Sequence, residues 1–181
     1  MEPSAHSVLS QWESFYVIVG SAGGALTGLM FVVVTLVADT NLPRSPDTLN
    51  AFGTPNVIHF AAVLMLSAVL SAPWQRLQNP AHVVGAMALA GVIYVLIVFR
   101  RMLRQRVSGY TPVLEDWMWH LVLPMIGYAS LFVGAAGMAH DQNWALFTLA
   151  AVSLLLLSIG LHNCWDTVAY VVARRTDKNT Q

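Results

Sequence analysis

The first long apolar run, residues 15–38, constrains the fold of this chain more than any other feature, because it contains no charged residue. At about 1.5 Å per residue, a helix of this length is roughly 36 Å long and crosses a hydrocarbon core of about 30 Å with some tilt. Its glycines recur four residues apart, at Gly20, Gly24 and Gly28. Residues with that spacing share one helix face. The run therefore predicts a membrane helix with a groove for close packing.

A second stripe of small residues lies in the apolar run 117–139 and consists of Gly127, Ser130, Gly134 and Gly137. Small residues at such spacing let helices associate in lipid, where apolar burial alone gains little. The two stripes fit packing within one chain. They fit about equally well a contact between copies of the chain or the wall of a pore. We expect a homo-oligomer.

Composition extends the membrane interpretation to the whole chain. Hydrophobic residues make up 56% of the sequence and charged residues 10%, whereas soluble domains carry about 25% charged residues. Further apolar runs cover residues 56–72, 81–99, 117–139 and 144–166, and the last helix is expected to extend to about residue 173. Pro124 removes a backbone donor and is expected to kink its span. We predict an all-α fold in which residues 1–181 form one bundle of five transmembrane helices.

The positions of lysine and arginine orient this bundle, because cytoplasmic loops of membrane proteins carry the excess of these residues. In a five-span arrangement one side holds only Arg76. The other side holds the remaining basic residues, namely Arg44, Arg100, Arg101, Arg104, Arg106, Arg174, Arg175 and Lys178. The predicted topology places the N-terminus outside and the C-terminus in the cytoplasm.

Several classes of protein are disfavoured by the same composition. The formal net charge is +0, which gives no sign of a nucleic-acid partner. A lone cysteine, Cys164, excludes an intramolecular disulfide. We find no nucleophile elbow, phosphate-binding glycine loop or pair of buried aspartates. We therefore expect a lipid-embedded protein that is not an enzyme.

Three histidines form the strongest candidate for a site. His59, His120 and His162 are each predicted about one turn inside the inner end of a span, and Asp166 follows His162 at i+4. A carboxylate at that spacing can orient an imidazole. One hypothesis is a divalent metal or haem site formed by the three histidines, or a proton relay. The simpler alternative, which requires no cofactor, is that they cap helix ends at the interface.

Glu13 lies at the start of the first span, beside Trp12. A carboxylate there can ring the mouth of a pore. It can also simply interact with the positive end of the helix dipole, which is the interpretation we favour.

The first helix also carries a resemblance. The pattern runs W-E-x-F-Y-V-x-V-G over residues 12–20 and A-L-T-G-L-x-F-V over residues 25–32. It resembles the opening helix of an uncharacterised family of small multi-pass bacterial inner-membrane proteins. The resemblance implies a location in the inner membrane and brings no ligand or catalytic residue.

Three functions remain as hypotheses. The first is a channel-like or transport-related conduit for ions or small solutes, because small-residue stripes occur with polar residues near both mouths. The second is a membrane redox protein that binds a metal or haem. The third is a scaffold or accessory subunit of a membrane complex.

Overall fold

The described part of the chain folds into helices. A computed structural model describes residues 5–38, 54–107 and 114–179 and has no strand in these ranges, so the predicted all-α class is confirmed there. The helices are α1 (Ala5–Ser10), α2 (Glu13–Ala38), α4 (Thr54–Leu70), α5 (Gln78–Val107), α6 (Leu114–Trp117), the π-helix η1 (Met118–Val122), α7 (Leu123–Ala139) and α8 (Trp144–Asn179).

Four stretches of helix are long and apolar enough to cross a membrane, as in a multi-pass membrane protein. They are Glu13–Val33, Gln78–Leu103, Met118–Ala139 and Trp144–Asp166. The expected span at 56–72 corresponds to α4, whose apolar part, Val57–Leu70, is shorter than these four. Of the basic residues that orient the chain, Arg44 lies outside the described residues, as do the side chains of those beyond Leu103.

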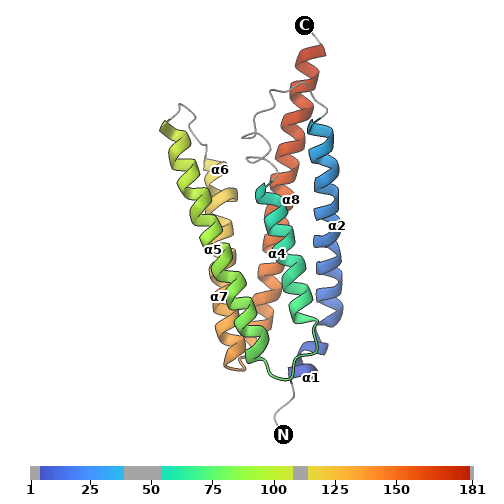
Figure 1. Cartoon of the computed structure of the whole chain (residues 1–181), viewed down its shortest axis with the longest axis vertical. Helices are drawn as coiled ribbons and strands as arrows, with labels where there is room; N and C mark the ends of the chain where they lie inside the picture. Colours follow the sequence, from blue (N-terminus) through green and yellow to red (C-terminus); the bar gives the residue numbers. More distant parts are fainter. Residues whose placement is uncertain (1–4, 39–53, 108–113, 180–181) are drawn as a thin grey trace.

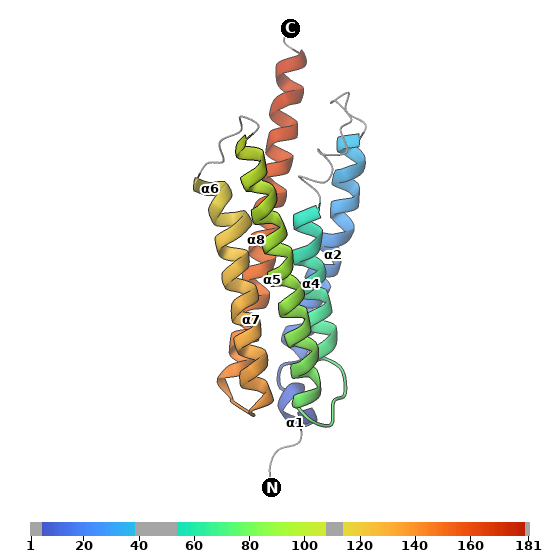
Figure 2. The same ribbon diagram turned by 60° about the vertical axis from the view of Figure 1, so that its left-hand side comes forward.

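Helix α8 organises the bundle. It packs against α7 and α4, while α5 packs on α7 and α2 packs on α4. Two helix pairs therefore meet at α8, which extends beyond the other helices in both views (Figures 1 and 2). Helix α1 and the C-terminal end of α8 lie at opposite ends of the bundle (Figure 1).

Close contact between α2 and α4 depends on glycines. A methyl group at Gly20 would lie 2.7 Å from Ser67 Cβ, and one at Gly23 would lie 3.1 Å from the carbonyl oxygen of Phe60. Gly28, by contrast, has no atom within 4 Å of that position. Gly20 and Gly23 therefore lie against α4, whereas Gly28, at the end of the predicted groove, does not.

The small-residue stripe of the fourth predicted span packs against α8. Methyl groups at Gly127, Gly134 and Gly137 would lie 3.2, 2.6 and 2.6 Å from side-chain atoms of Leu156, Leu149 and Trp144, respectively. Ser130 lies half-buried on the same helix. Gly24 of the first stripe makes only an ordinary contact, with Leu64 at 3.8 Å. In this chain the second stripe therefore serves an intramolecular contact.

The irregularity expected at Pro124 takes the form of a π-helical turn. The backbone N–H of Leu123 donates to the carbonyl of Met118, five residues earlier, and Pro124 is buried directly after this turn. Proline has no N–H to donate, and its ring would clash with the carbonyl four residues back. The wider π turn relieves that conflict and changes the direction of Trp119 and His120.

Candidate functional site

A histidine–tyrosine pair lies buried inside the bundle. His59 on α4 is 2% exposed and Tyr128 on α7 is 1% exposed. The His59 Nδ1 and Tyr128 hydroxyl oxygen are 3.1 Å apart. The hydroxyl donates this hydrogen bond when Nδ1 is unprotonated and accepts it in the other tautomer. Because an unpaired buried polar group is costly, the pair stabilises a contact between α4 and α7.

Tyr94 and Gly91 of α5 complete the surroundings of this pair. The Tyr94 ring meets the His59 ring edge-on, with centroids 6.2 Å apart. A methyl group at Gly91 would overlap the Cδ1, Cε1 and Cγ atoms of Tyr128. The tyrosine ring therefore lies directly against the α5 backbone, and three helices meet at one polar contact.

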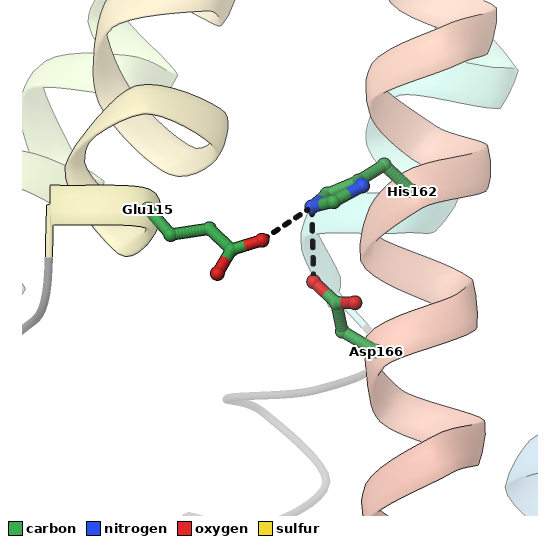
Figure 3. A network of polar contacts seen from close by, with 3 residues as sticks. All are labelled: Glu115, His162 and Asp166. Atoms are coloured by element: carbon green, nitrogen blue, oxygen red, sulfur yellow. Dashed lines mark ion pairs between the residues drawn. The ribbon is translucent and has the colours of Figure 1, made fainter.

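A second polar cluster lies where α6 approaches α8. His162 Nε2 is 3.1 Å from Asp166 Oδ2 and 3.6 Å from Glu115 Oε1 (Figure 3). The His162 and Asp166 side chains share one face of α8, as their i, i+4 spacing predicts, and Glu115 faces them from α6 (Figure 3). Both carboxylates are largely exposed, whereas Nε2 itself is buried.

Trp119 holds the imidazole of this cluster in place. Its ring stacks on the His162 ring, with centroids 3.7 Å apart and planes inclined by 17°. Trp119 belongs to the π turn, which aims its side chain at α8. The stack limits rotation of the imidazole, so Nε2 stays close to the two carboxylates.

The three predicted histidines do not converge on one point. His120, in the π turn, interacts electrostatically with His59, while His162 faces Glu115 and Asp166. Within the described ranges, a single group of three or more ligand-type side chains lies close enough to share a metal ion, and it consists of Glu115, His162 and Asp166.

Glu13 lies in the first turn of α2 and is exposed. This position suits an interaction of its carboxylate with the positive end of the helix dipole.

Two further buried hydroxyls lie on α2 and α4. The Tyr16 and Ser67 hydroxyl oxygens have no hydrogen-bond partner among the described residues. Ser67 lies eight residues after His59 on α4, about 12 Å along the helix axis. Buried hydroxyls are usually hydrogen-bonded to protein groups or to ordered water.

Sequence reasoning missed Glu115, Trp119 and Tyr128. Glu115 had a usable signal, because the predicted topology places residues 100–116 and His162 at the same end of the bundle. Trp119 and Tyr128 had none, because their roles depend on which face of α7 and η1 turns inward. Comparison with known protein families, with curated proteins and with solved structures finds no match to this chain.

Proposed function

We propose that this chain is a channel-like or transport-related membrane protein that conducts small cations, protons included. The buried His59–Tyr128 pair is the observation that carries this proposal. An ionisable side chain at membrane depth is costly, and such residues typically line ion pathways or proton relays. Most other buried positions of α4 are apolar, so packing alone does not call for a histidine there.

Polar groups on either side of the pair extend it into a route along the bundle. Towards the α1 end lie the unpartnered hydroxyls of Ser67 and Tyr16. Towards the other end lie His120, in the π turn, and the His162 cluster on α8. A relay of this kind needs polar groups and bound water rather than an open tunnel.

The proposal includes five spans, with α4 as the short one, in a bacterial inner membrane. It places the N-terminus outside and the C-terminus in the cytoplasm, an orientation supported by the excess of basic residues on one side. An odd number of spans agrees with the positions of α1 and the end of α8 at opposite ends of the bundle (Figure 1).

The proposal also includes a homo-oligomer. Gly28 faces no atom within 4 Å, and Leu29 and Phe31 beside it are exposed. This part of α2 is free to meet lipid or the α2 helix of a second copy. Native mass spectrometry from lipid nanodiscs would detect the oligomer, and a strictly monomeric mass would remove this part of the proposal.

Flux in proteoliposomes tests the conduit. The full chain is reconstituted with an internal pH dye, a potassium diffusion potential is applied, and proton entry is recorded. We expect flux above that of empty vesicles, and its loss in His59→Phe. The control is His82→Gln, because His82 is an exposed histidine of α5. Flux equal to that of empty vesicles, or unchanged flux in His59→Phe, would refute the proposal.

A further inference from the structure

We propose that Glu115, His162 and Asp166 bind one divalent transition-metal ion of the zinc type between α6 and α8. The three ligand atoms lie within 4.8 Å of one another. Imidazole nitrogen and carboxylate oxygen bind zinc at about 2.0–2.2 Å, so neighbouring ligand atoms are separated by about 3.0–3.6 Å. The contacts from His162 Nε2, 3.1 and 3.6 Å long, fall in this range.

The direction of these contacts also fits a metal ion. Although Asp166 Oδ2 is only 3.1 Å from Nε2, it forms no hydrogen bond with it, whereas Glu115 at 3.6 Å is too distant for one. In a hydrogen bond the oxygen lies along the N–H direction. In a metal site the ion occupies that direction, and the other ligands lie about 40° to the side of it. The Asp166 carboxylate is therefore near the imidazole but off its axis, as a ligand of a shared ion would be.

The Trp119 stack supplies the orientation that a metal-binding histidine needs. Metal sites commonly fix the ring of such a histidine through a neighbouring group. Here the stacked indole, 3.7 Å from the imidazole, limits its rotation. Glu115 and Asp166, which are 66% and 49% exposed, are free to close onto an ion with small side-chain rotations.

The ligand set indicates which ion binds. One imidazole with two carboxylates suits zinc, manganese or ferrous iron, whereas magnesium and calcium prefer oxygen ligands alone. Two carboxylates and a neutral imidazole also balance the charge of a divalent ion. Three protein ligands leave at least one coordination position for water.

The location makes the site accessible from water. Glu115 and Asp166 are charged side chains that are 66% and 49% exposed. The proposal places the cluster at the level of the lipid headgroups, because exposed carboxylates are costly within the hydrocarbon core. A bound ion would join α6, and with it η1 and α7, to α8. This site does not depend on conduction through the bundle, since it rests on other residues than His59 and Tyr128.

Equilibrium binding to the full chain in lipid nanodiscs tests the site. The protein is first treated with a chelator, and zinc is then titrated calorimetrically in the presence and absence of excess magnesium. We expect one zinc ion per chain, little competition by magnesium, and affinity at least about tenfold weaker in Glu115→Gln and in His162→Gln. The matched control is the double variant His140→Gln, Asp141→Asn, which alters an exposed histidine–aspartate pair at the α7–α8 turn.

The outcomes separate clearly. Weakened binding in Glu115→Gln with unchanged binding in the control supports the site, and Glu115→Gln decides the question if His162→Gln fails to fold. Three results would overturn the proposal: no saturable zinc binding to the unaltered chain, equal affinity in Glu115→Gln, or displacement of zinc by equimolar magnesium. The flux measurement is not involved, so either proposal can fail without the other.

Discussion

Replacing Gly91 with alanine should destabilise the bundle, and the size of the effect follows from three contributions. The new methyl group would overlap the Cδ1, Cε1 and Cγ atoms of Tyr128. Because Cγ lies next to the backbone, the ring cannot avoid the methyl group by moving its tip alone. Either the tyrosine changes rotamer or α5 moves away from α7.

Overpacking of this kind costs about 1–3 kcal/mol. A displaced Tyr128 also leaves His59 buried without its hydrogen bond, which costs about 1–3 kcal/mol more. Alanine in place of glycine returns about 1 kcal/mol through helix propensity. The expected net loss of unfolding free energy is therefore about 3 kcal/mol, and its sign does not depend on the propensity scale.

Gly85→Ala is the matched control. Gly85 lies on the same helix and also faces α7, but a methyl group there would lie 3.9 Å from Ala135 Cβ, an ordinary contact. We expect a change within about 1 kcal/mol, in the stabilising direction. Reversible unfolding in mixed detergent micelles measures both values.

A double-mutant cycle with Tyr128→Phe separates the contributions, because phenylalanine keeps the ring but lacks the hydroxyl. In that background Gly91→Ala should cost less than in the unaltered chain, since no hydrogen bond to His59 remains to be lost. Equal stability of Gly91→Ala and Gly85→Ala would refute the packing described for Tyr128. Full additivity in the cycle would show that the hydrogen bond is not coupled to Gly91.

Two further predictions concern other contacts. Gly20→Ala should lower the unfolding free energy by about 1–3 kcal/mol, because its methyl group would meet Ser67 Cβ at 2.7 Å. Gly28→Ala should be neutral or stabilising in the same unfolding assay. Equal losses in the two variants would contradict the α2–α4 contact. Trp119→Leu should weaken zinc binding by about tenfold although all three ligands remain, because the His162 ring is no longer stacked. Unchanged affinity in the calorimetric titration would show that the stack does not position the imidazole.

The sequence alone determined the helices of this protein, because the signal for them is local. Each predicted run, from residues 15–38 to residues 144–166, has a helix that covers all or most of it. An uncharged run of that length satisfies its backbone groups in lipid by forming a helix. The pairing of His162 with Asp166 was predictable for the same reason, since four residues along a helix bring two side chains to one face.

Only the tertiary structure decided which faces meet. A helix in water carries one apolar stripe that marks its buried side, but these helices are apolar all round, and only the small-residue stripes on two of them indicated a packing face. Nothing in the sequence therefore indicated that the Tyr128 ring lies against Gly91, or that Gly28 has no neighbouring atom within 4 Å of an added methyl group. Glu115 meets His162 because the π turn and the packing of α7 on α8 bring distant parts of the chain together. Rotation of each helix about its own axis, set by contacts between helices, assembled the site.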